Sequence, residues 1–424
     1  MRKSLSIFPL LTAFLFHAFF FASGLRAGAA DGTLDVYWVD VEGGGATLIV
    51  TPAGESVLID SGYPGERDAK RIFDVATGVA GVKQIDHLVT THYHLDHFGG
   101  AATLSTLMPI RNVYDNGLFK EGWEKPSKEY LEFKAEKRVV LSAGDEIPLR
   151  QPDRASAQGQ GPDPAFAQGQ EPERSFARGR EPDRAGPIGT KSRTPSPDAP
   201  RSSDLRSDRT DTVRLPPSRA GQVLSLRCVM ARQTPLPAPP DAVANDDCAG
   251  ARRQRPDYGD NANSINLLLT FGDFRFFDGG DTSWNVELKL VCPVKLVPPV
   301  DVYQVNHHGQ ASSNNPLLIA ALSPTVAVMN NGPRKGGQPL TFATLKAQPS
   351  IEALFAVHKN VKPGEEDANT ADELIANVDE ACQGNYIKMS VAPDGERYTI
   401  AIPAKGYTRT FSTNHPAASR GVGK

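Results

Sequence analysis

The feature that most constrains the fold of this chain is a run of six residues, His92 to His97, that holds three histidines and one aspartate. The run follows an apolar segment, residues 85–90, whose composition predicts a buried strand. Two glycines come next, and residues 101–108 predict a helix. The four polar side chains are therefore expected in a loop at the carboxyl end of a strand, where an α/β scaffold presents its ligands.

These residue types at this spacing favour a metal site. Neutral imidazoles and carboxylates are the usual protein ligands of zinc and similar divalent metals. His92 and His94 are two residues apart, so in an extended segment their side chains point the same way. Asp96 and His97 follow where the chain turns, and they can face a second metal ion. A polar loop of satisfied histidines is the plainer alternative, which a lone histidine would favour.

The run from His92 to His97 resembles the His-x-His-x-Asp-His motif of the metallo-β-lactamase-fold hydrolases. Three other segments resemble further motifs of that superfamily in the expected order. Residues 57–62 resemble an early strand that ends in an aspartate, residues 276–281 a later strand that ends in a bridging aspartate, and residues 306–309 the last ligand motif. The resemblance implies an α/β (α+β) fold, the metallo-β-lactamase-type αββα sandwich, with two mixed sheets face to face and the site at one edge.

The resemblance also implies roles for individual residues. Two groups of metal ligands are expected, one made of His92, His94 and Asp281 and the other of Asp96, His97, Asp281 and His308. Of the two neighbouring histidines, we prefer His308 as the ligand and expect His307 to face the substrate. Asp60 would orient a ligand histidine, and a helix N-cap or turn is an equal alternative for it. The cofactor would be zinc, as one or two divalent ions, with manganese as the alternative.

Two metals at such a centre would share a hydroxide whose pKa lies near neutral, and the hydroxide would attack a phosphoryl or carbonyl centre. Asp96 could orient this hydroxide, so Asp96 and His307 are the candidate catalytic residues. Asn331, Arg334 and Lys335, in a polar loop after an expected strand, are the candidate substrate-binding residues. The two cations could hold an anionic group, and a solvated turn is the alternative.

Within the superfamily, the chain resembles the hydrolase domain of the bacterial competence DNA-uptake protein and its secreted relatives (the ComEC-like branch). An early segment resembles that branch's Asp-Val-Gly-Gln-Gly-Asp pattern, except that Glu42 replaces a glycine and Gly45 an aspartate. The branch lacks the histidine that completes the first metal site in most of the superfamily, and this chain has no histidine between residues 98 and 306. Water, Asn263 or Asp260 could fill that place, or the first site could be weak or empty. Asn263 is our candidate for a supporting role next to the ligands.

These features predict an exported metal-dependent hydrolase that acts on a phosphodiester or another phosphate ester. One alternative is a hydrolase of amide, lactam or ester bonds, although a β-lactamase would be expected to keep the missing histidine. The other is a non-catalytic metal-binding module of the same fold. The expected partner is a small-molecule or phosphodiester substrate. Nucleic acid stays open, but a net charge of −3 offers no basic field for it.

Composition divides the chain into segments. Residues 1–30 predict a signal peptide, with two basic residues before an apolar stretch and small residues near its end. A secreted or periplasmic protein without stable membrane association is therefore expected, and an uncleaved anchor is the alternative. Residues 151–220 are rich in Pro, Gly and Arg, contain an imperfect ten-residue repeat, and predict a disordered insertion. The hydrolase domain would comprise residues 31–150 and 221–412, and residues 413–424 would form a loose tail.

The four cysteines, Cys228, Cys248, Cys292 and Cys382, permit two disulfides in an exported chain. A bridge from Cys228 to Cys248 would close a Pro-rich loop, and one from Cys292 to Cys382 would tie the late core to the C-terminal part. The sequence leaves all three pairings open.

The C-terminal part predicts a helix over residues 372–381 and a closing hairpin formed by residues 386–392 and 398–402. His358 ends an expected strand over residues 353–357. It could enter the site, but an edge position is the plainer expectation.

Overall fold

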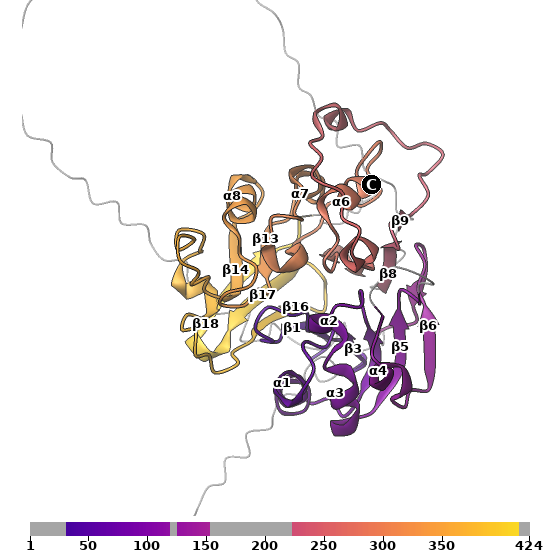
Figure 1. The fold of residues 1–424 in the computed structure, drawn as a ribbon, viewed down its shortest axis with the longest axis vertical. Coiled ribbons are helices and arrows are strands. Elements are labelled where there is room, and N and C mark those ends of the chain that lie inside the picture. The colour runs from indigo at the N-terminus through magenta and orange to yellow at the C-terminus, as the bar shows by residue number, and fades with distance from the viewer. Residues whose placement is uncertain (1–30, 119–124, 153–222, 415–424) are drawn as a thin grey trace, which may run out of the picture.

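The computed structural model describes residues 31–118, 125–152 and 223–414. The predicted signal peptide, nearly all of the predicted insertion and most of the predicted tail lie outside these residues. Within them, the chain forms two large β-sheets with helices around them (Figure 1). None of the helices in the described ranges is long and apolar enough to cross a membrane.

The first sheet has the strand order β18-β17-β16-β1-β2-β3-β4-β5-β6. It is antiparallel from β18 to β3 and parallel from β3 to β6. Its strands are β1 (Leu34–Trp38), β2 (Thr47–Val50), β3 (Ser56–Ile59), β4 (Ile85–Val89), β5 (Ile110–Asp115), β6 (Lys137–Val140), β16 (Ile387–Val391), β17 (Arg397–Ile402) and β18 (Tyr407–Ser412).

The second sheet has the order β15-β14-β13-β12-β11-β10-β8-β7, with the short β9 paired to β8. It is parallel from β11 to β15 and antiparallel over the rest. Its strands are β7 (Glu146–Ile147), β8 (Leu224–Ala231), β9 (Thr234–Pro235), β10 (Asn266–Phe271), β11 (Phe274–Asp278), β12 (Val302–Gln304), β13 (Val326–Met329), β14 (Ala353–His358) and β15 (Ile375–Asn377).

Helices follow the strands of each sheet. In Figure 1, α1, α3 and α4 lie with the early strands, and α6, α7 and α8 lie with the later ones. The α-helices are α1 (Glu66–Asp74), α2 (Leu95–Phe98), α3 (Ala101–Leu107), α4 (Lys128–Glu132), α6 (Trp284–Glu287), α7 (Pro316–Leu322) and α8 (Pro339–Ala347). The short π- and 3₁₀-helices are η1 (Val75–Val79), η3 (Asp246–Gly250), η4 (Asp260–Asn263), η5 (Leu288–Leu290), η6 (Asn306–Gly309), η7 (Asp372–Leu374) and η8 (Pro403–Lys405).

Apolar side chains fill the space between the two sheets and the space under the helices. Val36 and Trp38 of β1 join Phe276 and Phe355 of the second sheet in the central core. Tyr37, between them in sequence, packs on the opposite face with residues of α1 and α3, because successive side chains of a strand alternate in direction. A third apolar cluster packs α7 and α8 on the second sheet. These layers confirm the predicted αββα sandwich of two mixed sheets.

One predicted element is wrong. Residues 372–381 do not form a helix, because only the turn η7 is helical and Ile375–Asn377 forms β15, parallel to β14. Ile375 and Ala376 are buried there. Burial at the sheet edge therefore overrides the helix-favouring composition. The predicted hairpin is confirmed by the pairing of β16 with β17, and β18 extends it.

The disulfide of the structure joins Cys248 to Cys292. Neither of the two bridges considered from the sequence forms, since Cys228 and Cys382 are both free thiols. Cys228 points into the central core between the sheets, and Cys382 donates a hydrogen bond to Asp40 Oδ2 at 3.0 Å. Their places in the fold keep both thiols away from the Cys248–Cys292 bridge.

Candidate metal centre

Three segments carry polar side chains to one edge of the two sheets. The run from His92 to His97 follows the end of β4, and α2 begins within it. In the second sheet, β11 ends at Asp278, and Asp281 follows after two glycines. The strand β12 ends at Gln304, and η6 with its two histidines comes next. Because β11 and β12 are parallel neighbours, their carboxyl ends meet at the same edge.

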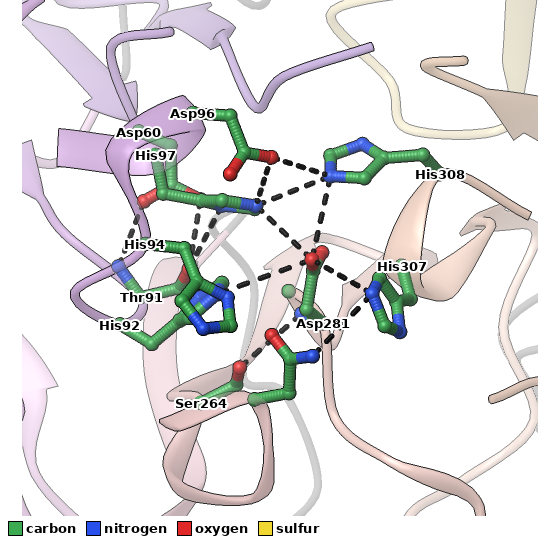
Figure 2. A network of polar contacts seen from close by, with 12 residues as sticks. Asp60, Thr91, His92, His94, Asp96, His97, Ser264, Asp281, His307 and His308 are labelled. Atoms are coloured by element: carbon green, nitrogen blue, oxygen red, sulfur yellow. Dashed lines mark hydrogen bonds and ion pairs between the residues drawn. The ribbon is translucent and has the colours of Figure 1, made fainter. Parts of the chain in front are cut away.

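These segments gather the six predicted ligands into two groups that share Asp281. We call them the first group and the second group, and together the metal centre (Figure 2). In each group, one donor atom from every member lies within 4.8 Å of the others; the first group is His92, His94 and Asp281, and the second is Asp96, His97, Asp281 and His308. Asp281 Oδ2 lies 3.2 Å from His97 Nε2 and 3.4 Å from His308 Nε2. The binding of metal by these side chains stays a prediction.

The carboxylates of the centre are buried and ionised. Burial alone would raise the pKa of Asp281, but the surrounding histidines, His308 first, hold it well below its usual value. The pKa of Asp96 is likewise held well below its usual value, against the effect of burial, by His97 and His308. Buried negative charge needs a compensating cation. The histidine nitrogens and carboxylate oxygens form a donor set that fits a divalent metal such as zinc.

The histidines of the two groups differ in their electrostatics. Burial would lower the pKa of His97, but Asp281, Asp60 and Asp96 raise it well above its usual value. For His92, burial and the neighbouring His97 lower the pKa well below its usual value. The second group is thus the more strongly anionic environment of the two.

Asp60 lies behind the ligands and reaches both groups, the second directly and the first through Thr91. Asp60 Oδ2 lies 2.7 Å from His97 Nδ1 and accepts a hydrogen bond from Thr91 Oγ1 at 2.8 Å. Thr91 Oγ1 in turn lies 3.1 Å from His92 Nδ1. One carboxylate therefore orients a histidine of each group, as metal sites require of their supporting residues. Sequence reasoning missed Thr91, although its place directly before the first histidine was a usable signal.

Gly45 makes room for this support. A Cβ at position 45 would lie 2.8 Å from Asp60 Oδ2 and 2.9 Å from His97 Nδ1. The chain departs from the competence-like pattern here, with glycine in place of aspartate, and the departure leaves the Asp60–His97 contact undisturbed.

Asp260 and Asn263, the residues considered for the place of the missing histidine, support the first group from behind. Asp260 Oδ2 accepts a hydrogen bond at 2.6 Å from the backbone N–H of Tyr93, which stands between His92 and His94. Asn263 donates through Nδ2 to Asp260 Oδ1 at 3.0 Å. Both side chains are buried. Asn263 therefore acts on the ligands through Asp260.

A second support comes from Ser264, which sequence reasoning placed only within an Asn-x-x-Ser-like stretch. Its Oγ accepts a hydrogen bond from the backbone N–H of Asp281 at 3.2 Å. The segment around η4 therefore fixes the backbone on both sides of the first group.

His307 and His308 both adopt the left-handed backbone region, each with φ of 53°. Such backbone costs a non-glycine residue about 1–3 kcal/mol and persists where the surrounding structure fixes it. Both Nε2 atoms lie 3.4 Å from Asp281 Oδ2. His308 Nε2 also lies 3.2 Å from Asp96 Oδ2, so His308 belongs to the second group, whereas His307 stands beside the centre. The preference for His308 as the metal ligand stays a prediction.

Lys335 reaches the centre from the loop after β13. Its ammonium pairs with Asp96 Oδ2 and lies 3.1 Å from Tyr63 Oη. The lysine side chain is 30% exposed, so it can be approached from solvent. A hollow of about 430 Å³ opens beside Tyr63 and is lined by Glu42, Tyr63, Pro64, Glu66, Arg67 and Asp68.

The other two predicted substrate-binding residues have different partners. Arg334 pairs with Glu380 at 2.5 Å, and the two side chains are 57% and 50% exposed. Asn331 is buried and donates through Nδ2 to the carbonyl oxygen of His358 at 2.8 Å. The structure therefore brings Lys335 to the metal centre and engages Arg334 and Asn331 elsewhere.

The sequence model of the Metallo-beta-lactamase superfamily matches residues 40–183. No curated protein sequence matches the chain.

Several solved structures are similar to the chain. CmlA, a diiron β-hydroxylase from Streptomyces venezuelae, has 13% identity and a TM-score of 0.33, over 70% of this chain and 44% of that one. The metallo-β-lactamase fold protein YhfI from Bacillus subtilis has 9% identity and a TM-score of 0.37, over 76% and 96%. Igni18, a metallo hydrolase from the archaeon Ignicoccus hospitalis, has 12% identity and a TM-score of 0.31, over 70% and 82%. The chain thus spans less than half the length of CmlA. The match over residues 40–183, together with the αββα sandwich, shows that this chain has the metallo-β-lactamase fold.

Proposed function

We propose that this protein is an exported metal-dependent hydrolase of phosphodiesters or other phosphate esters. The observation that carries the substrate class is Lys335, whose partly exposed ammonium lies at the edge of the metal centre. A phosphate oxygen that enters beside the centre would meet this cation, and a charge-assisted hydrogen bond would form. A neutral amide or ester would gain much less from it.

The chain's own residues divide the work of such a reaction. The six ligands would hold one or two divalent ions, zinc before manganese, in view of their nitrogen and oxygen donors. When bound, such ions activate a water molecule and draw charge from the oxygen of the scissile group. Asp281 belongs to both groups and would be the ligand that they share. Asp96 belongs to the second group and pairs with Lys335, so it connects this cation to the centre. His307 stands beside Asp281 outside both groups, and in this proposal it would contact the substrate.

Two finer parts of the proposal rest on the sequence. The lack of a histidine between residues 98 and 306, and the form of the segment from Tyr258 to Ser264, support a place in the competence-like branch. The pattern of residues 1–30 supports export to the periplasm or the medium.

The test combines metal content by mass spectrometry with hydrolysis of bis-p-nitrophenyl phosphate and of a chromogenic cephalosporin. We expect one to two metal ions per chain and cleavage of the phosphodiester, both reduced in His94→Ala. The matched control is Asp74→Asn, at a surface residue paired with Lys70, which should change neither. Cleavage of the cephalosporin alone would move the protein to the lactam class. Bound metal without turnover of either substrate would contradict a hydrolase and favour the non-catalytic module.

A further inference from the structure

The first group offers three donors, one fewer than the second, and an unexplained polar atom lies on a side chain that contacts His307 beside the centre. Oδ1 of Asn261 is buried and has no hydrogen-bond partner among the described residues. Leaving a buried polar group unsatisfied costs about 1–3 kcal/mol. Such an atom at the rim of a candidate metal centre leaves an oxygen available to a ligand.

The amide of Asn261 is joined to the centre by His307. Asn261 Nδ2 lies 3.4 Å from His307 Nε2, and the same imidazole nitrogen lies 3.4 Å from Asp281 Oδ2. Oδ1 and Nδ2 are bonded to one carbon, so the unpartnered oxygen lies at the same rim. The neighbouring Asp260 anchors Tyr93 inside the first group's segment, so η4 is fixed on the side of that group.

His307 also determines which atom of the amide is free. His307 Nδ1 lies 3.1 Å from Ser313 Oγ and 3.2 Å from Ser312 Oγ. When Nδ1–H donates to a serine hydroxyl, Nε2 is an acceptor, and Asn261 must turn Nδ2 toward it. Oδ1 is then the atom left for a ligand. Figure 2 shows the ring of His307 beside Asp281.

We propose that Asn261 Oδ1 is the further protein ligand of the first metal ion, in the place of the missing histidine, and that His307 positions it. The proposal rests on the proposed function in that it assumes a divalent metal at the centre. An amide oxygen is a harder donor than an imidazole, so the first ion should favour oxygen-binding metals such as manganese more than it would with a histidine in that place. It should also bind more weakly than the ion of the second group, which has four histidine and carboxylate donors.

The test titrates the metal-free protein with zinc and separately with manganese, followed by calorimetry and native mass spectrometry. Two ions of unequal affinity are expected for the wild type. Asn261→Leu, which removes the oxygen at similar volume, should weaken the lower-affinity ion at least about tenfold, as loss of support typically does at metal sites. The tighter ion should be unchanged. Asn261→Asp keeps an oxygen and should retain both ions, and Asn112→Leu, at a partly buried asparagine of β5, should alter neither.

The positioning role of His307 has its own test. His307→Leu should weaken the same lower-affinity ion, because the amide loses its fixed orientation. The double variant with Asn261→Asp should restore that ion, since a carboxylate offers an oxygen on either side and needs no orientation. A purely structural role of His307 would not be rescued in this way.

The outcomes separate this inference from the proposed function. Unchanged affinity of both ions in Asn261→Leu, or a wild type that takes up a single ion, overturns the ligand role of Asn261. If Asn261→Leu does not fold by circular dichroism, Asn261→Ala is titrated instead and decides by the same criterion. A wild type that binds two ions as expected but cleaves neither substrate overturns the hydrolase and leaves the ligand role supported. A wild type without metal overturns both.

Discussion

Two clusters of similar side chains in this protein differ in what balances their charge. One is the metal centre around Asp281. The other, which we call the Asp40 cluster, consists of Asp40, Arg71, His358 and Cys382. Three members of the Asp40 cluster offer donor atoms within 4.8 Å of one another, as the ligands of the metal centre do. By donor atoms alone, both would qualify as metal sites.

The central carboxylate of the Asp40 cluster already has a permanent cation. Asp40 Oδ1 lies 2.7 Å from His358 Nε2, and Oδ2 accepts a hydrogen bond from the Arg71 guanidinium at 3.3 Å. Burial, and then the hydrogen bond to Asp40, raise the pKa of the Cys382 thiol to about 11, so the thiolate that a metal needs is scarce. At the metal centre, within the described part of the chain, every ion-pair contact of Asp281 is with a histidine. The two clusters therefore differ in whether the central carboxylate already has a permanent cation.

The largest expected effect is that of Asp281→Ala, which removes the ligand shared by both groups. We expect metal content near zero and a fall in phosphodiester cleavage of about 10³-fold or more, which corresponds to about 4 kcal/mol. Mass spectrometry and kcat measure the two losses. The matched control is Asp40→Asn in the Asp40 cluster, and this variant should bind as much metal as the wild type. If Asp281→Ala retained two ions, the contrast between the clusters would be lost.

A smaller effect is expected from Lys335→Met. Loss of the cation should raise KM for bis-p-nitrophenyl phosphate about tenfold, or about 1.4 kcal/mol, because one charge-assisted contact is lost. The kcat should change less, and Lys335→Arg should recover part of the binding. Arg334→Met is the control, since Arg334 pairs with Glu380 at the surface. Equal effects of the two Met variants would show that Lys335 has no special place at the centre.

The metal centre was predictable where it is local in sequence. The spacing of His92 to His97 after an apolar strand, and the resemblance it carries, pointed to the same two groups that the structure gathers. Asn261 could not be found in this way, because its role depends on which loops meet in space. The two strained histidines are a further case, since the left-handed backbone of His307 and His308 has no signature in side-chain type.

The fold likewise divides into features that are local in sequence and features that depend on tertiary contacts. The alternating strands of the two sheets and the closing hairpin follow from local pattern, whereas β15 is a strand only because an edge of the second sheet is open beside β14. His358 was expected at a sheet edge, and it is instead fully buried against Asp40, which is 318 residues away in the sequence. The pairing of Cys248 with Cys292 likewise depends on loops brought together by the fold.

Removal of the cation from the Asp40 cluster should affect stability and leave metal binding intact. Arg71→Met leaves the fully buried Asp40 without its guanidinium, whose own side chain is 20% exposed. We expect a loss of about 2 kcal/mol in the free energy of unfolding, below the range for fully buried pairs. Urea unfolding measures this loss, and metal content should equal that of the wild type. Lys70→Met, in an exposed pair with Asp74, is the control and should have little effect. A third ion bound by wild-type protein would contradict the argument from charge balance.

The smallest and most specific effect is the pH dependence of the Asp40 cluster. Burial would raise the pKa of Asp40, but hydrogen bonds from His358 and Cys382 lower it below its usual value. The unfolded chain therefore binds a proton at higher pH than the folded protein does. The stability that Asp40 contributes is complete above its usual pKa of about 4 and is lost as the pH falls through the lower, folded value.

Urea unfolding of wild type and Asp40→Asn between pH 7 and pH 3 measures this contribution, because acid titration of the metal centre occurs in both proteins and cancels in the difference. The difference should be constant down to about pH 4 and shrink below it. A difference that shrank already between pH 7 and pH 5 would contradict the assignment of this pH dependence to the Asp40 carboxylate.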